Sequence, residues 1–208
     1  MKEYLYKHGV NFTSAGYPIF TEDMLSKEIP EGACPIGHTN HIKDKKNFLL
    51  VAFCNDEYIY RSIKKLPNEL DYYLQFKAFG GFDLSPRINW DIKLQRFNLL
   101  INKLADAYLA VNGVKLIPNF RTGCLDTFDV LSIYPPNTWY SVGTLGSSKG
   151  HVKINELYLR TKLLITNPDM LIYYGTLKTE YKQILDEFGV PYKVFADFQR
   201  LSRGKEAV

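Results

Sequence analysis

Short apolar runs alternate with amphipathic stretches along most of this chain, and this alternation constrains the fold more than any other feature. Phe48-Leu-Leu-Val-Ala-Phe53 and Met170-Leu-Ile-Tyr-Tyr174 are continuous apolar runs of strand length. Such runs are typical of strands that are buried on both faces. Because helical patterns lie between the runs, we expect parallel strands joined by right-handed helical crossovers.

The expected fold is therefore α/β, with a mostly parallel sheet of about six strands and flanking helices. A doubly wound open sheet and an incomplete β/α-barrel-like sheet both fit this pattern. The predicted strands cover 48–53, 77–84, 114–120, 139–144, 170–174 and 192–196. Residues 1–47 are predicted to form an irregular extension, because Gly and Pro recur in them, on a single α/β domain that spans 48–208.

The longest predicted helix covers 91–111. Leu94, Phe97, Ile101 and Leu104 recur in it at steps of three and four residues, so we expect these side chains to face the core. An earlier helix is predicted to start after Asn55 and to run to about residue 65. Pro67 is predicted to break it before a second helical segment over 68–75.

A glycine-rich loop follows the strand predicted at 139–144 and leads into a helix predicted at 152–166. The loop contains Gly143, Thr144, Gly146, Ser147, Ser148, Lys149 and Gly150. Glycines free the backbone, and backbone N–H groups at a helix N-terminus can point at an anion. The spacing matches neither a Walker A loop nor a dinucleotide-binding fingerprint. The loop predicts an anion site, and a tight turn without a ligand is the alternative.

A set of residues, most of them polar, lies at the carboxyl ends of the predicted strands. They are Asn55, Asp56, Asp83, Ser85, Pro86, Asn119, Arg121, Thr144, Gly146, Ser147, Tyr174, Gly175 and Thr176. In parallel α/β proteins, ligands bind beyond the carboxyl ends of the strands. We therefore expect these residues to converge on one rim, where Arg121 could hold a phosphate or carboxylate group with its planar guanidinium.

The predicted roles at this rim differ. Asp83 is predicted to act as a general base or to orient a hydroxyl, with Ser85 in support and Asp56 or Asp126 as a partner acid. The predicted ligand-binding residues are Arg121, Asn98, Gly143, Thr144, Gly146, Ser147, Ser148, Lys149 and Gly175. Two structural alternatives stay open: Asp83 could cap a turn, and Arg121 could form an ion pair with Asp83 or Asp126.

Cys34, His38 and His41 are candidate metal ligands, with Cys54 or Cys124 as a fourth ligand. The spacing of the first three residues is not one of the usual zinc arrangements. The sequence therefore predicts no metal site, and it names no cofactor.

Charge and composition exclude some classes of protein. The net charge of +4, from 26 Lys and Arg against 22 Asp and Glu, is too weak an excess to indicate a nucleic-acid-binding face. We see no signal peptide, and no apolar run approaches the roughly 20 residues that a membrane span needs. The odd number of cysteines, three, suits a reducing compartment. These features predict a cytoplasmic protein that does not enter a membrane.

Several short motifs recur in order along the middle and C-terminal parts of the chain. They are Phe82-Asp-Leu-Ser-Pro86, Gln95-Arg-Phe-Asn98, Tyr108, Gly113, Lys115-Leu-Ile-Pro-Asn-Phe-Arg121, Ser141-Val-Gly-Thr-Leu-Gly146 and Tyr173-Tyr-Gly175. With these motifs, residues 48–190 resemble a family of uncharacterised proteins from phages, prophages and plasmids, the domain-of-unknown-function family 4417. The resemblance implies an α/β fold and a mobile-element protein, and it brings no established activity or cofactor.

The expected function is that of a phage or mobile-element accessory protein that binds a phosphate-bearing ligand, either a nucleotide or a nucleic-acid end. Phosphodiester or glycosidic hydrolysis is the expected reaction class if the site is catalytic. One alternative is a non-enzymatic protein that binds and inhibits a host defence or replication factor. Another is a protein that sequesters a signalling nucleotide without turnover. The sequence does not indicate the oligomeric state.

Overall fold

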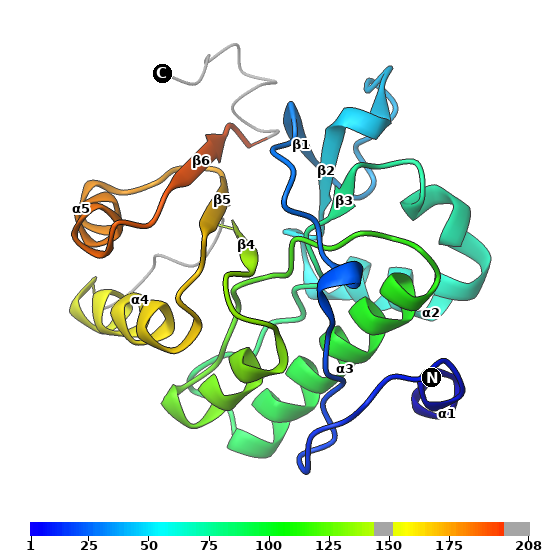
Figure 1. Cartoon of the computed structure of the whole chain (residues 1–208), viewed down its shortest axis with the longest axis horizontal. Helices are drawn as coiled ribbons and strands as arrows, with labels where there is room; N and C mark the ends of the chain where they lie inside the picture. The colour runs from blue at the N-terminus through cyan, green and yellow to red at the C-terminus, as the bar shows by residue number, and fades with distance from the viewer. Residues whose placement is uncertain (144–151, 198–208) are drawn as a thin grey trace.

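Two parallel sheets of three strands each form the centre of the protein, in a computed structural model that describes residues 1–143 and 152–197 (Figure 1). The first sheet has the order β1 (Gly32–Pro35), β2 (Phe48–Val51) and β3 (Ala78–Phe79). The second has the order β4 (Trp139–Gly143), β5 (Met170–Tyr174) and β6 (Tyr192–Phe195). The α/β class and the parallel strands are confirmed. The single six-stranded sheet is wrong, and the described residues form no closed barrel.

The third strand predicted from the sequence joins the two sheets instead of extending either one. Leu116 forms an isolated bridge with Phe79 of β3, and Asn119 forms one with Ser141 of β4. Pro118 lies between the two bridges. Since proline has no N–H group, it cannot continue a hydrogen-bonded ladder. The segment therefore pairs with the first sheet before Pro118 and with the second sheet after it.

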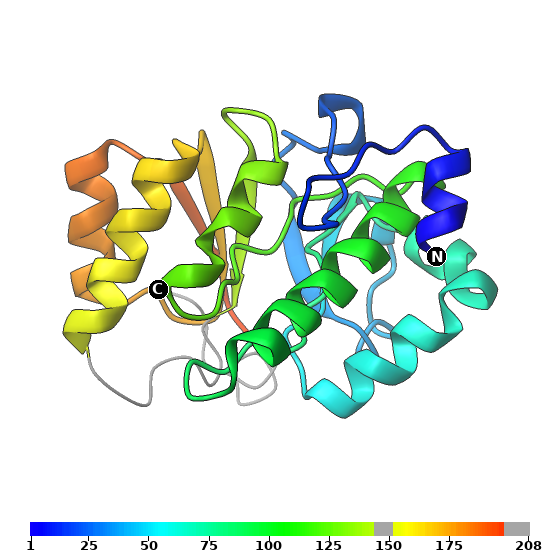
Figure 2. The same cartoon turned by 90° about the horizontal axis from the view of Figure 1, so that it is seen from below.

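Helices cover one face of both sheets. Along this face lie α2 (Asp56–Tyr73), α3 (Ile92–Val111), the 3-10 helix η3 (Leu125–Ile133), α4 (Val152–Thr166) and α5 (Thr179–Phe188). Neighbours in this order pack against each other, and Figure 2 shows them as a continuous row. The main hydrophobic core fills the space between the row and the sheets. A smaller cluster, with Leu49 and Val51 of β2 and Ile172 and Tyr174 of β5, is shared by the other faces of the two sheets.

One continuous helix, α2, replaces the two segments expected around Pro67. Its predicted N-cap is confirmed, because Oδ1 of Asn55 accepts a hydrogen bond from the backbone N–H of Tyr58 at 3.0 Å. Pro67 lies on the exposed side of α2. Leu66 and Tyr73 are buried on either side of it and hold the helix against the core.

Helix α3 confirms the predicted boundaries and part of the predicted core face. Ile101 and Leu104 are half-buried and pack against the core, whereas Leu94 and Phe97 are 43% and 56% exposed. The buried side chains instead include the polar Gln95, Asn102, Lys103 and Asp106. This polar face holds the loop that precedes the helix.

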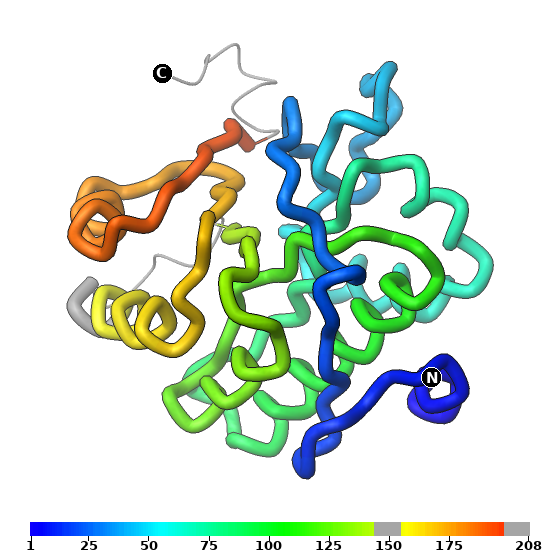
Figure 3. Tube along the Cα trace, in the orientation of Figure 1, coloured from blue at the N-terminus to red at the C-terminus, as the bar shows by residue number. Residues whose placement is uncertain are grey.

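The N-terminal segment contains more regular structure than the sequence predicts. It holds α1 (Lys2–Lys7), the short 3-10 helices η1 (Glu22–Met24) and η2 (Lys45–Asn47), and strand β1. Figure 3 shows its path from α1 across the molecule to β1. The backbone N–H groups of Phe20 and Ser26 donate to the carbonyls of Ile133 and Leu116, respectively, so the segment is tied to both halves of the fold.

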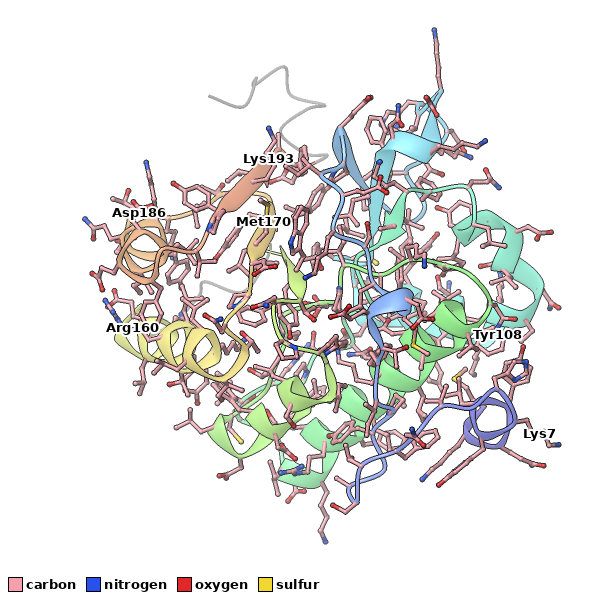
Figure 4. All side chains as sticks on the ribbon, viewed as in Figure 1. Lys7, Tyr108, Arg160, Met170, Asp186 and Lys193 are labelled. Carbon is pink, nitrogen blue, oxygen red and sulfur yellow. The ribbon has the colours of Figure 1, made fainter. Side chains whose placement is uncertain are left out.

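An ion pair joins the last two helices of the row. Arg160 of α4, labelled in Figure 4, lies with Nη1 2.6 Å from Oε2 of Glu187 in α5. Both side chains are exposed enough for water to screen the pair, so packing between the helices contributes more to their association. Nowhere in the described part of the chain is there a helix with the length and apolar character needed to cross a membrane.

Candidate functional site

A cavity of about 530 Å³ lies at the carboxyl edge of the second sheet. Gly143 at the end of β4, Tyr173 near the end of β5 and Asp197 just beyond β6 line it. Tyr158 and Lys162 line it from α4. This is the edge at which parallel α/β proteins bind ligands, and the volume falls in the range of small-molecule sites.

Basic side chains dominate the charge of the cavity lining. Arg87, Arg121, Lys162 and Lys178 line it, against one carboxylate among the described lining residues, that of Asp197. A concave surface with this balance creates a positive potential and concentrates anions.

Aromatic rings supply much of the remaining lining. Phe120, Tyr158, Tyr173 and Tyr181 all contribute to it. Tyr158 and Tyr181 are half-buried, and Nζ of Lys178 lies 6.0 Å from the ring centroid of Tyr181. Flat rings beside cations can bind a ligand that has both a planar group and an anionic group.

Arg121 is held at the cavity by a carboxylate behind it. Its Nε lies 3.8 Å from Oδ1 of Asp83, and the same Oδ1 accepts a hydrogen bond from Nδ2 of Asn119 at 2.9 Å. Burial raises the pKa of Asp83, while Arg121 and Asn119 oppose this shift. The side chain of Arg121 lines the cavity and is 29% exposed.

Lys162 is a half-buried amine in the cavity wall. Its Nζ donates to the carbonyl oxygen of Phe120 at 2.8 Å and lies over the rings of Phe120 and Phe128, 5.3 and 5.7 Å from their centroids. Burial, reinforced by the charge of Arg121, lowers the pKa of Lys162 to about 7. A substantial fraction of Lys162 is therefore uncharged near neutral pH.

The polar face of α3 fixes the backbone that leads to the cavity. Oδ1 of Asp106 accepts from the N–H of Phe82 at 2.8 Å. Asn102 forms two hydrogen bonds with the backbone of Leu84, through Oδ1 at 3.0 Å and through Nδ2 at 3.1 Å. Because these groups are buried, each bond prevents the cost of an unpaired polar atom.

The same helix face continues toward the cavity rim. Nδ2 of Asn98 donates to the carbonyl of Ser85 at 3.0 Å, and Nε2 of Gln95 donates to that of Trp90 at 2.8 Å. From α2, Oδ1 of Asp56 accepts from both the N–H and the hydroxyl of Ser85 at 3.0 Å. These bonds position the segment from which Pro86, Arg87 and Ile88 line the cavity.

A second charged pair lies deeper, below Asp83. Nζ of Lys103 is 3.7 Å from Oδ2 of Asp106 and 3.5 Å from the carbonyl oxygen of Asn119. Both side chains are almost fully buried. Burial lowers the pKa of Lys103 and raises that of Asp106 to about 6. Neither residue lines the cavity, so the pair supports the backbone beneath the cavity and does not face a ligand directly.

The structure brings together several of the residues predicted to form the site. Arg121 and Gly143 line the cavity. Asp83 lies behind Arg121, while Ser85 and Asn98 hold the backbone of the rim, so these three act as supports in this geometry. Their predicted catalytic and ligand-binding roles stay predictions.

Two glycines of the predicted site have structural reasons to be glycine. A Cβ atom on Gly143 would lie 2.4 Å from Cδ1 of Phe53. Gly175 has a φ of 113°, which favours glycine, and its N–H donates to the carbonyl of Phe195 at 2.8 Å. Thr144, Gly146, Ser147, Ser148 and Lys149 lie outside the described residues, so the predicted anion-binding loop stays a prediction.

Sequence reasoning missed Arg87, Lys162 and Lys178. Lys162 has the sequence context of a polar position on an amphipathic helix, which gives no sign of a cavity wall. Gln95, Asn98, Asn102 and Asp106 did leave a signal, because their three- and four-residue spacing places them on one face of the predicted helix.

Cys34, His38 and His41 do not form a metal site with other described residues. In residues 1–143 and 152–197, no group of three or more His, Cys, Asp and Glu side chains is arranged to hold a metal ion. Cys34 is buried in β1, and burial raises the pKa of its thiol to about 12.

Fold and cavity together define a parallel α/β protein with a cavity, lined mainly by basic and aromatic side chains, at the carboxyl edge of its second sheet. The family described as "Domain of unknown function (DUF4417)" matches residues 16–193. The chain therefore belongs to the DUF4417 family, as its motifs indicate. No curated protein and no solved structure matches it.

Proposed function

We propose that this protein binds a phosphate-bearing ligand, a nucleotide or a nucleic-acid end, in the cavity at the carboxyl edge of the second sheet. One observation carries the proposal: four basic side chains line the cavity against one carboxylate among the described residues. In this arrangement Arg121 contacts the phosphoryl group, because its guanidinium is always charged and can form two parallel hydrogen bonds to phosphate oxygens.

The aromatic lining favours a nucleotide over inorganic phosphate. Tyr158 and Tyr181 line the same cavity as Arg121 and provide flat faces for a base. A volume of about 530 Å³ also accommodates more than a phosphate ion.

Binding is supported more directly than hydrolysis. A general base must reach the reacting group, whereas Asp83 does not line the cavity and its Oδ1 already faces Asn119 and Arg121. We therefore assign Asp83 to positioning Arg121. Product release by wild type that is lost in Asp83→Asn, with ligand binding retained, would restore the catalytic role of Asp83.

A thermal-shift screen tests the proposal. The panel contains mononucleotides, cyclic dinucleotides, dinucleotide cofactors, sugar phosphates and short oligonucleotides, each with and without divalent metal. A ligand at about 100 times its dissociation constant adds about 2.7 kcal/mol, which corresponds to a rise of about 5–10 °C for a chain of this size. We expect Arg121→Ala to abolish the shift. Arg61→Ala is the matched control, since Arg61 lies on α2 and pairs with Glu57 away from the cavity.

A protein partner, such as a host defence or replication factor, is the second candidate. It is favoured by Leu157, Leu164 and Ile165 of α4, which are 54%, 74% and 46% exposed. Their spacing of seven and eight residues places them on one helix face. Partner binding that survives Arg121→Ala and is lost in Leu164→Glu would support this candidate over the first.

A further inference from the structure

We propose that Lys162 is a reactive amine that condenses with the carbonyl group of a small phosphorylated aldehyde or ketone bound in the cavity. The inference rests on the proposed function, because the basic lining residues would hold the phosphoryl group while Lys162 meets the carbonyl carbon. It narrows the ligand from any phosphate compound to one that carries an aldehyde or ketone.

The position of Lys162 differs from that of an ordinary surface lysine. It lines the cavity, and its Nζ has one hydrogen-bond acceptor among the described residues, the carbonyl oxygen of Phe120 at 2.8 Å. The rings of Phe120 and Phe128 flank the amine, with centroids 5.3 and 5.7 Å away. In the described part of the chain, no carboxylate lies within ion-pair distance of it. Burial without a close carboxylate disfavours the ammonium ion, and the cation–π attraction of the two rings opposes this effect.

Lys103 provides an internal comparison. It is almost fully buried, whereas Lys162 is half-buried; its Nζ lies 3.7 Å from Oδ2 of Asp106, and it does not line the cavity. Lys103 is therefore a structural residue, whereas Lys162 combines a place in the cavity wall with an amine that has no close carboxylate among the described residues.

The charge state of Lys162 supports the same conclusion. Burial, with the charges of Arg121 and Lys103, lowers its pKa from the ordinary value of 10.5 to about 7, although Asp83 opposes this shift. Only the uncharged amine has a free electron pair for attack on a carbonyl carbon, and desolvated lysines next to another cation are activated in this way.

The proposed step is a condensation that needs no oxidant or reductant. Nζ attacks the carbonyl carbon and forms a C–N bond. The carbonyl oxygen then leaves as water together with the two hydrogens of the amine, so that a C=N bond remains between Lys162 and the ligand. Arg121 lines the same cavity and can hold the phosphoryl group of that ligand during the step.

Reductive trapping tests the inference on the wild-type protein. Glyceraldehyde 3-phosphate is added at neutral pH with sodium borohydride, which reduces the imine to a stable secondary amine. Mass spectrometry should show an adduct with the mass of the probe minus one oxygen atom, and peptide mapping should place it on Lys162. We expect Lys162 to be labelled at least about tenfold faster than any other lysine, because ordinary lysines are almost fully protonated at this pH.

Two variants sharpen the result. Lys162→Arg keeps the positive charge and should lose the adduct, whereas Lys182→Arg alters an exposed lysine of α5 that does not line the cavity and should keep it. Labelling spread evenly over the lysines, or unchanged adduct yield in a folded Lys162→Arg protein, would overturn the proposal. The mapping on wild type needs no variant, so a folding defect in Lys162→Arg does not affect the test.

Two further probes separate this inference from the proposed function. If nucleotides raise the melting temperature but glyceraldehyde 3-phosphate leaves Lys162 unlabelled, the reactive amine is wrong and the anion site stands. If glyceraldehyde without phosphate labels Lys162 as fast as its phosphate ester, and no phosphate compound shifts the melting temperature, the phosphorylated substrate class is wrong and the anion site fails with it.

Discussion

Nε of Arg121 lies 3.8 Å from Oδ1 of Asp83, and Arg121 lines the cavity while Asp83 does not. Asp83 is in turn fixed by Asn119, which donates to Oδ1 at 2.9 Å. The pair therefore joins a buried carboxylate to a cation in the cavity wall. We infer that Asp83 holds the guanidinium of Arg121 in place.

Asp83 and Arg121 should be coupled in ligand binding. We expect Asp83→Asn to weaken binding about fivefold, equivalent to about 1 kcal/mol, because Arg121 loses its fixed position. In an Arg121→Gln background the same change should have little further effect, since the side chain that Asp83 positions is gone. Titration calorimetry on the four proteins measures the coupling, and additive effects would argue against a positioning role.

Lys162 should give the protein a distinct dependence of stability on pH. Its pKa of about 7 in the folded state lies below the ordinary lysine value of 10.5. Between these two values the unfolded chain binds a proton that the folded protein does not, so the free energy of unfolding rises with pH in this window. The slope is at most about 1.4 kcal/mol per pH unit.

Urea denaturation of wild type and Lys162→Met checks this prediction. The difference in the free energy of unfolding between the two proteins should change between about pH 7 and pH 10, in favour of wild type at the higher pH. All other titrating groups are shared and cancel in the difference. Parallel profiles would show that the amine of Lys162 titrates normally.

Among the α3 residues that hold the rim, Asn102 should contribute most to the free energy of unfolding. Replacing it by Ala removes both hydrogen bonds to Leu84. Two buried backbone groups lose their partners, so we expect a loss of about 2 kcal/mol or more in unfolding free energy. Asn68→Ala, at an exposed position of α2, is the control and should change stability by less than about 0.5 kcal/mol. Equal effects of the two changes would contradict the role of Asn102.

The ring of Phe53 should determine how much stability is lost when a side chain is added at Gly143. The Cβ atom of Gly143→Ala would lie 2.4 Å from Cδ1 of Phe53, and this crowding should lower stability by about 1–3 kcal/mol. Phe53→Leu makes room at the same point, so the double variant should lose less stability than the sum of the single changes. Simple additivity in thermal unfolding would mean that the ring is not the obstacle.

Much of the fold could be predicted from the sequence, because its signals are local. The apolar run 170–174 is strand β5 as predicted, and Asn55 caps α2 through its own side chain. Pro118 carried a local signal as well, since a proline in a central strand argues against that strand. Pro118 could therefore have been used to predict that the strand is interrupted and that the sheet divides into two.

The candidate site was harder to predict because it depends on contacts between distant segments. Asp83 and Arg121 come together only when residues 82–90 and 114–121 fold against α3. The burial of Lys162 depends on Phe120 and Phe128, which belong to other parts of the chain. No spacing within α4 distinguishes this lysine from an exposed one.

The most direct test of the account is the affinity of wild type, Arg121→Gln and Arg61→Gln for the phosphate compound that gives the largest thermal shift. Calorimetry should show at least about a tenfold loss of affinity for Arg121→Gln, equivalent to about 1.4 kcal/mol, and no loss for Arg61→Gln. Equal affinities in all three proteins would show that the cavity beside Arg121 is not the phosphate site, and would contradict the central claim.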